Sequence, residues 1–327
     1  SSGTDNAVNT SGFTGSDAHI PDFVLHNNEV FKVVGFDRCA FYGNKTVQTV
    51  TFGRFIGEGQ TDEKPGIWDC TFRNMQALTA INADPANVYY GNRAGIANEG
   101  VLFAKSGSYT VQDEDGNPVT DVTLGDSVLT NRLMVYPVGK TDSSYTIPDN
   151  ITVIERYAFA GNPYLKSVDL NGVTVVGSHA FYNVTGLTDI GTGYQLVYVE
   201  DSAFENTVLE TVSLTPSLVG IGARAFYKTN LKGTISLYDN IGHIGDGAFG
   251  RCTQISAFEL KTPTAIEAAY VPAYTVLDGV LFARDGEALR LIQYPAQKEP
   301  DDPLYDMSDM PVTAIAADAF FGCRYLQ

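Results

Sequence analysis

A six-residue phrase that recurs five times limits the folds open to this chain more than any other feature. In each copy an aliphatic residue stands five positions before a phenylalanine, and an alanine stands directly before that phenylalanine. The copies occupy residues 154–159, 176–181, 199–204, 221–226 and 244–249. Their phenylalanines follow one another at intervals of 22, 23, 22 and 23 residues. Regular spacing of this length indicates structural units stacked along one axis.

A second phrase follows each phenylalanine and carries apolar residues at alternating positions. One copy has Val168 and Leu170, and another has Val212 and Leu214. This alternation is typical of a β-strand with one face in the core. Intervals of 22 residues hold a strand, a turn and a return segment, but not a strand and a full helix. We therefore expect parallel strands nearly in register, with the phenylalanines and the aliphatic residues of the first phrase forming columns in the core.

The array extends to both sides of this segment. Further copies of the first phrase lie at residues 36–41, 67–72 and 315–320. The two gaps between the copies share a Gly-Val-Leu-Phe phrase, at 100–103 and 279–282, and each continues to a Tyr-Pro pair. In the second gap Asp285 and Gly286 separate two apolar runs, which is a strong hairpin signal. We expect an irregular, hairpin-bearing coil in each gap.

These patterns predict a single solenoid over residues 23–327, preceded by a flexible leader over residues 1–22. The leader begins with small polar residues and lacks the basic and apolar stretches of a signal peptide, so we expect any export signal to have been removed. The expected order of segments is coils at about 30–83, an irregular insertion at about 84–148, regular coils at about 149–261, a second irregular insertion at about 262–310 and an incomplete final coil at 311–327.

The fullest copy of the repeat, from Ile244 to Ile255, resembles the BspA-type class of leucine-rich repeats. The Gly-Val-Leu-Phe and Tyr-Pro phrases resemble the irregular coils of the same family, and the resemblance covers about residues 30–327. It implies a mainly β, right-handed leucine-rich-repeat solenoid with a parallel β-sheet, coils of 22–23 residues and hairpin-bearing irregular coils. It also implies a bacterial protein that is secreted or held on the cell surface, in a family implicated in adhesion.

The charge balance argues against two classes of partner. The chain has 38 acidic and 21 basic side chains and a formal net charge of −17. Such a surface repels phosphate backbones and anionic lipid headgroups, so we expect no nucleic-acid binding. A run of 18 apolar residues is missing from the sequence, so we expect no transmembrane segment in this chain.

The sequence lacks the common catalytic and cofactor motifs, and we expect no enzyme activity, no cofactor and no metal site. Of the four histidines, His179 stands two residues before Phe181, in a slot that accepts very different side chains in other copies. We therefore expect His179 to be an ordinary surface histidine. The acidic stretch 113–117 resembles a calcium loop, but Val111 stands where an EF-hand needs an oxygen ligand, which favours a polar turn.

Four cysteines occupy two slots of the repeat. Cys39 and Cys70 each stand two residues before a phenylalanine, and Cys252 and Cys323 each stand three residues after one. Same-slot residues on adjacent coils can approach disulfide distance. Parallel stacking points both side chains in the same direction, however, so we favour buried free thiols.

The exposed side of the second-phrase strands, which we call the strand face, is the predicted binding surface. Its residues are Thr49, Thr51, Ser167, Asp169, Thr211, Ser213, Thr234, Ser236 and Glu259. One interpretation is that Thr and Ser suit a solvated strand; the other is a docking surface for a protein or a glycan. The polar stretch at about 105–128 is the other candidate, because long loops on rigid scaffolds often carry recognition.

Three functions remain open at the level of the sequence. We favour a non-catalytic cell-surface or secreted adhesion module that presents its solenoid to a protein partner, including a host matrix or cell-surface protein. The alternatives are a structural spacer or stalk and a glycan-binding accessory protein. A protein binder should expose a contiguous aromatic or apolar patch, a glycan binder should expose tyrosine beside amides and carboxylates, and a spacer should expose neither.

Overall fold

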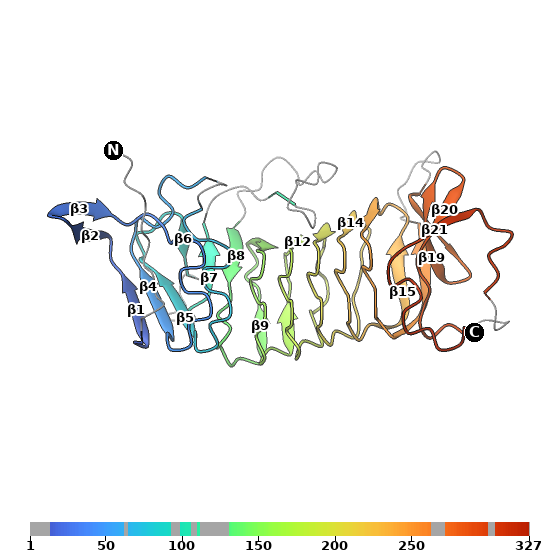
Figure 1. Cartoon of the computed structure of the whole chain (residues 1–327), viewed down its shortest axis with the longest axis horizontal. Coiled ribbons are helices and arrows are strands. Elements are labelled where there is room, and N and C mark those ends of the chain that lie inside the picture. Colours follow the sequence, from blue (N-terminus) through green and yellow to red (C-terminus); the bar gives the residue numbers. More distant parts are fainter. Residues whose placement is uncertain are drawn as a thin grey trace.

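Short strands stacked side by side along one long axis give the molecule its elongated form (Figure 1). The computed structural model describes residues 14–61, 65–92, 99–105, 110–111, 131–262, 272–299 and 305–326. These residues contain 21 strands and no helix. The predicted mainly β, leucine-rich-repeat-type solenoid with parallel strands and coils of 22–23 residues is therefore confirmed.

The first phrase of the repeat forms the longest sheet, which has eight strands in the order β16-β14-β13-β12-β10-β8-β7-β6. Its regular strands are β10 (Ile151–Ile154), β12 (Val175–Val176), β13 (Tyr198–Val199), β14 (Gly220–Ile221) and β16 (His243–Ile244). They pair in parallel so that the aliphatic residue of each phrase faces that of the next, for example Val199 beside Ile221. The aliphatic residues that form a column in the core are therefore also the residues that pair with one another in the sheet.

The second phrase forms parallel strands in three groups instead of one continuous sheet. The groups are β1 (Asp17–Ile20) with β4 (Thr49–Phe52) and β5 (Ala80–Ala83), β9 (Ser144–Thr146) with β11 (Ser167–Asp169), and β15 (Lys232–Tyr238) with β17 (Gln254–Lys261). Between the last two groups, residues 207–215 form no strand. There the Ser213 N–H donates to the Tyr194 hydroxyl at 2.9 Å. This backbone N–H therefore bonds to a side chain and not to the backbone of a neighbouring strand.

The phenylalanines of the first phrase form a fully buried column through the core. Neighbouring rings from Phe159 to Phe249 are 4.7, 5.1, 5.4 and 5.6 Å apart between centroids and nearly parallel. The N–H groups of Phe159, Phe181, Phe204 and Phe226 each donate at 2.8 Å to the carbonyl of the alanine in the next coil, as Phe204 does to Ala225. A small residue before each phenylalanine lets the backbones approach closely enough for this ladder.

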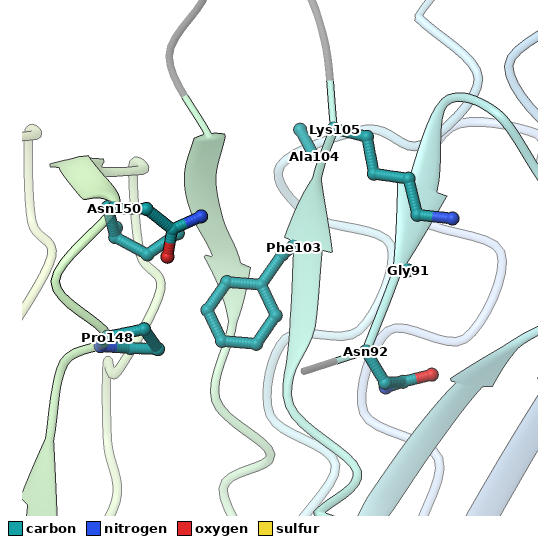
Figure 2. Close-up of a pocket in the computed structure, with 8 residues that line it drawn as sticks. Gly91, Asn92, Phe103, Ala104, Lys105, Pro148 and Asn150 are labelled. Atoms are coloured by element: carbon teal, nitrogen blue, oxygen red, sulfur yellow. The ribbon is translucent and has the colours of Figure 1, made fainter. Parts of the chain in front are cut away.

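Both irregular coils carry the predicted hairpin. The first contains β6 (Tyr90–Gly91), β7 (Leu102–Ala104) and β8 (Asn131–Val135), and the second contains β18 (Tyr274–Leu277), β19 (Val280–Asp285), β20 (Ala288–Gln293) and β21 (Val312–Ile315). Tyr136 and Tyr294 of the Tyr-Pro pairs take the place of the column phenylalanine, because their N–H groups donate at 2.8 Å to Ala158 and Ala319. Figure 2 shows Phe103 of the first irregular coil pointing from β7 towards Pro148 and Asn150 of the next coil.

The predicted leader over residues 1–22 is wrong in its second half. β1 pairs in parallel with all four residues of β4, and its Ala18 and Ile20 side chains are buried. Apolar residues alternate with Asp17 and His19 in this short segment, which is the signature of a strand with one buried face. Residues 1–13 lie outside the described part of the chain. A hairpin of β2 (Phe23–His26) and β3 (Glu29–Lys32) follows β1.

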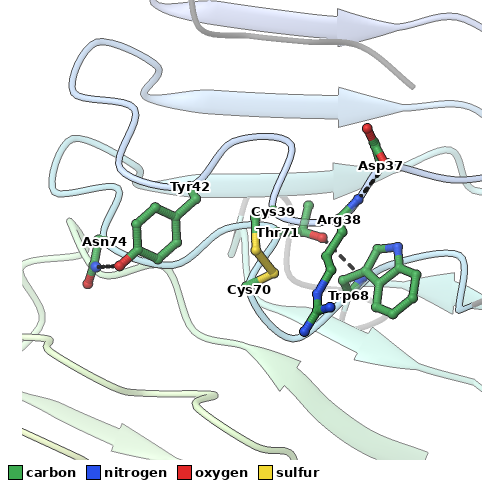
Figure 3. The surroundings of a disulfide bond; sticks show 8 residues. All are labelled: Asp37, Arg38, Cys39, Tyr42, Trp68, Cys70, Thr71 and Asn74. Carbon is green, nitrogen blue, oxygen red and sulfur yellow. Dashed lines mark hydrogen bonds between the residues drawn. A yellow bond between two sulfur atoms is a disulfide. The ribbon is translucent and has the colours of Figure 1, made fainter. Parts of the chain in front are cut away.

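The prediction of free thiols is wrong for the first pair of cysteines. Cys39 and Cys70 form a disulfide with their Cα atoms 4.7 Å apart (Figure 3). Cys39 has a left-handed φ of 57°, and Cys70 in the same slot does not, so their side chains do not point in the same direction. Cys252 and Cys323 are free, with Cys252 buried and Cys323 half-buried.

Candidate recognition surfaces

The strand face consists of partly or fully exposed side chains that alternate with buried ones. Thr49 and Thr51 lie on β4, Ser167 and Asp169 on β11, Thr234 and Ser236 on β15, and Glu259 on β17; Thr211 and Ser213 lie in the segment without a strand. The register brings Ser236 directly beside Glu259. The nine residues are therefore divided among the strand groups and do not form one unbroken row.

In the β15–β17 part of the strand face the polar side chains bond to one another. The Ser236 hydroxyl donates to Glu259, and the Lys261 ammonium lies 3.0 Å from that hydroxyl and 2.8 Å from the Glu259 carboxylate. The hydrogen bonds from Lys261 and Ser236 lower the pKa of Glu259. Because these groups bond to one another, this part of the face resembles an ordinary solvated strand pair.

A second surface lies on the return segments, at the positions two before and one after each column phenylalanine; we call it the turn face. The position two before the phenylalanine has a φ of 60° at Tyr157, 58° at His179, 53° at Ser202 and 56° at Arg224. A left-handed backbone is costly for residues other than glycine. Here their N–H groups donate to the next coil, as His179 does to the Asp201 carbonyl at 2.9 Å, and this ladder holds the conformation.

Aromatic and arginine side chains stack along the first half of the turn face. The Arg73 guanidinium lies 3.5 Å from the centre of the Tyr157 ring. Tyr157 lies 4.7 Å from the His179 ring, which in turn lies 5.4 Å from Tyr182. Stacking of a guanidinium on an aromatic ring is attractive and rigid. The slot that the sequence analysis considered permissive therefore holds an ordered stack.

The second half of the turn face repeats this chemistry. Arg224 donates a two-pronged pair of hydrogen bonds to the buried carboxylate of Glu205 and lies 4.0 Å from the Tyr227 ring. Arg251 lies 5.6 Å from the same ring and 4.3 Å from Phe321 of the final coil. The hydrogen bonds with Glu205 raise the pKa of Arg224. The row thus continues to the last described coil.

A hollow of about 350 Å³ separates the two halves. It is lined by Ser178, His179, Tyr182, Asp201, Ser202, Glu205, Ala223 and Arg224. Its origin is a difference in side-chain size, because Ser202 occupies the slot that holds the larger His179 and Arg224 in the adjacent coils. The hollow offers two rings on one wall, a guanidinium on the other and carboxylates beside the floor.

The prediction of an ordinary surface histidine at position 179 is wrong. The ring is half-buried and its Nδ1 lies 2.8 Å from the Ser178 hydroxyl. Burial, followed by the positive charge of Arg156, lowers the pKa of His179 to about 4, against a smaller opposing effect of Glu205. The imidazole is consequently neutral at pH 7 and acts as a hydrogen-bonding and stacking group.

A smaller hollow of about 140 Å³ lies beside β7 and is lined by Gly91, Asn92, Phe103, Ala104, Lys105, Pro148, Asn150 and Ile151 (Figure 2). Its polar side chains serve the backbone: Asn92 donates to the carbonyls of Ile81 and Val101, and Lys105 donates to that of Asn87. The polar stretch at 105–128 lies outside the described residues except for 105, 110 and 111, as does the calcium-like stretch 113–117.

The parallel coils, the aliphatic and aromatic columns and the hairpin-bearing insertions define a leucine-rich-repeat solenoid. Residues 140–265 match six copies of the BspA type leucine rich repeat region. Residues 140–265 are therefore a BspA-type leucine-rich-repeat region. A comparison with curated proteins gives no match.

Several solved structures are similar to this chain. One is a leucine rich cell surface protein from Faecalibacterium prausnitzii, with 20% identity, a TM-score of 0.44 and coverage of 96% of this chain and 62% of that protein. Another is the pneumococcal vaccine antigen PcpA, with 17% identity, a TM-score of 0.37 and coverage of 97% of this chain and 55% of that protein. A third is a leucine-rich repeat protein from Bacteroides ovatus, with 18% identity, a TM-score of 0.39 and coverage of 95% of this chain and 85% of that protein. The chain spans less than two thirds of the length of the first two. The described residues contain no helix that is long and apolar enough to cross a membrane.

The turn face was missed by the sequence analysis, although a signal for it was present. Position two after the phenylalanine is Gly161, Asn183 or Asn206 in three successive coils, and all three have a left-handed φ. Glycine and asparagine are the residues that most readily adopt this conformation. A tight series of turns with ordered outward side chains was therefore readable from these positions.

Proposed function

We propose that this chain is a non-catalytic adhesion module displayed outside a bacterial cell, and that it holds a protein partner on the turn face. The BspA-type repeat region at residues 140–265 supports the first part. The disulfide between Cys39 and Cys70 supports an extracellular position, because structural disulfides persist mainly in oxidising compartments. The partner is a protein, with host matrix and cell-surface proteins as the leading class.

The observation that carries this proposal is the row of arginine and aromatic side chains with a hollow at its centre. Tyrosine and arginine dominate the residues that contribute most to protein–protein affinity, whereas serine and threonine are under-represented there. The stacks that hold Tyr157 and Arg224 also fix their rotamers before binding, which reduces the entropic cost of association. The strand face, with its hydroxyl groups, remains the second proposed contact surface.

A hollow-filling substitution tests the turn face. Ser202→Tyr places in this coil the side chain that Tyr157 supplies at the same left-handed slot, so the fold should be retained. Binding to a panel of immobilised matrix proteins should fall by about tenfold or more, in line with loss of a central contact. Thr211→Tyr puts the same side chain on the exposed strand face and is the matched control. Loss of binding by the control alone would move recognition to the strand face.

One observation favours a glycan as a second candidate partner. Tyr182 and His179 line the hollow together with the carboxylate residues Asp201 and Glu205. A panel of glycans measured with the same two variants separates the candidates. If the unaltered chain binds glycans but no protein, and Ser202→Tyr abolishes that binding, the partner is a carbohydrate and not a protein. Binding of the unaltered chain to neither panel would contradict both and leave the spacer.

A further inference from the structure

The stack of side chains on the turn face is interrupted at one coil, and the hollow lies at this interruption. The position two before the column phenylalanine is occupied, in successive coils, by Tyr157, His179, Ser202 and Arg224. Where two of these residues have rings, at Tyr157 and His179, the rings pack against each other with centroids 4.7 Å apart. Ser202 supplies no ring, so its coil leaves a gap between His179 and Arg224.

The gap has the depth of a single aromatic ring. The coils around it are spaced like the rest of the array, because the Phe204 ring lies 5.1 Å from that of Phe181 and 5.4 Å from that of Phe226. A ring at the level of Ser202 would therefore lie about 5 Å from each neighbour, which is a stacking distance for aromatic side chains. The volume of about 350 Å³ is near the lower end of the range of about 300–1,000 Å³ for ligand pockets, so it suits one side chain.

Two opposite walls of the hollow offer surfaces that stack on rings. One wall consists of His179 and Tyr182, whose rings lie 5.4 Å apart. The lowered pKa of His179, about 4, keeps this wall uncharged at pH 7. The other wall is Arg224, which covers the Tyr227 ring at 4.0 Å and donates two hydrogen bonds to Glu205. The N–H groups of a guanidinium lie in its plane, so these bonds leave its second face able to stack on another ring.

The remaining lining of the hollow is polar. It includes the hydroxyl groups of Ser178 and Ser202 and the carboxylates of Asp201 and Glu205. Covering such groups with a side chain that lacks a donor would remove water from them without replacing its hydrogen bonds. A phenol O–H or an indole N–H supplies a donor at the edge of a ring, so tyrosine and tryptophan suit the hollow better than phenylalanine does.

We propose that the hollow receives one aromatic side chain of the protein partner, a tyrosine or a tryptophan, which completes the stack between His179 and Arg224. The proposal rests on the proposed function, because it names the residue with which the partner engages the turn face. Tyrosine and tryptophan are enriched among the residues that dominate interface energies, and they bind there in well-packed central pockets.

Filling the gap from within the chain tests the fit without a partner. Ser202→Tyr and Ser202→Leu place a large side chain at the same left-handed position, so the backbone strain is the same in both. Only the tyrosine ring can stack on both walls, and the tyrosine variant should melt about 2 °C or more above the leucine variant. A leucine variant that melts at the same or a higher temperature would overturn the proposal.

A library of random peptides displayed on phage tests which side chain enters the hollow. Peptides selected on the unaltered chain that bind Ser202→Tyr about tenfold more weakly or worse are those that depend on the hollow. We expect these peptides to share a tyrosine or a tryptophan. Replacing that residue with leucine should raise the dissociation constant by about tenfold or more, and replacing a tyrosine with phenylalanine should raise it less. Thr211→Tyr is the matched control and should bind the same peptides as the unaltered chain does.

The outcomes separate this proposal from the proposed function. Hollow-dependent peptides that share no aromatic residue would overturn the proposal and leave the turn face as the recognition surface. A selection that yields only peptides able to bind Ser202→Tyr equally well would overturn the proposal too. The panel of matrix proteins tests the proposed function by itself, because loss of their binding to Ser202→Tyr does not depend on which residue of the partner enters the hollow.

Discussion

Phe204 lies at the centre of the aromatic column and shows how much one residue contributes to the stack. It is fully buried, with the rings of Phe181 and Phe226 at 5.1 and 5.4 Å. Phe204→Ala should leave a cavity between two coils and lower the free energy of unfolding by about 3–5 kcal/mol in denaturant titrations. Phe321→Ala, at a partly exposed ring, should cost about 1 kcal/mol or less. Equal costs would mean that the column is not the core.

His179 should make stability depend on pH. The folded chain keeps this imidazole neutral down to a pKa of about 4, whereas the unfolded chain protonates it near 6.5. Between these values the unfolded state binds the extra proton, so the stabilising contribution is complete above pH 6.5 and is lost as the pH falls towards 4. Melting temperatures measured across this window should fall less steeply for His179→Gln. Parallel slopes would contradict the buried, neutral imidazole.

The disulfide between Cys39 and Cys70 links the first two coils and should stabilise them. Cys39 and Cys70 are 31 residues apart, and closing a loop of this length stabilises a fold by about 3–4 kcal/mol in the chain-entropy model. A reductant should therefore lower the melting temperature of the N-terminal coils. The double variant Cys39→Ser, Cys70→Ser should be as unstable as the reduced chain and insensitive to reductant. A reductant effect that persists in this variant would point to another bond.

The coil was predictable from the sequence because its apolar positions repeat, and repetition records which side chains face the core. The strand at 17–20 was missed because four residues give too short a pattern beside a polar leader. The gap in the second-phrase strands was missed because it depends on the Tyr194 hydroxyl, which belongs to the preceding coil. The disulfide was missed because Cys39 and Cys70 differ in φ although they occupy the same slot, and spacing does not encode that difference. The nine residues of the strand face remain a prediction.

On the scale of the whole molecule, stability should decrease from the middle towards the ends. The central coils belong to one continuous core, whereas the N-terminal and C-terminal coils belong to separate, smaller ones. A coil with a neighbour on both sides is stabilised by two interfaces. Hydrogen exchange should be slowest at the ladder amides of Phe181, Phe204 and Phe226 and fastest in β2–β3. Uniform exchange rates would indicate that the array unfolds as one cooperative unit.

In seven of the eight copies of the first phrase the position two before the phenylalanine is left-handed, with Cys70 as the exception, and only one of the seven occupants is glycine. The occupants are Cys39, Tyr157, His179, Ser202, Arg224, Gly247 and Asp318. Since N–H bonds to the adjacent coil hold this conformation at Tyr157, His179, Ser202 and Arg224, the backbone there does not depend on the identity of the side chain. Such a scaffold separates shape from specificity. Substitutions at this position can change the outward side chain of one coil at a time, and new partners can be acquired without a change in the backbone.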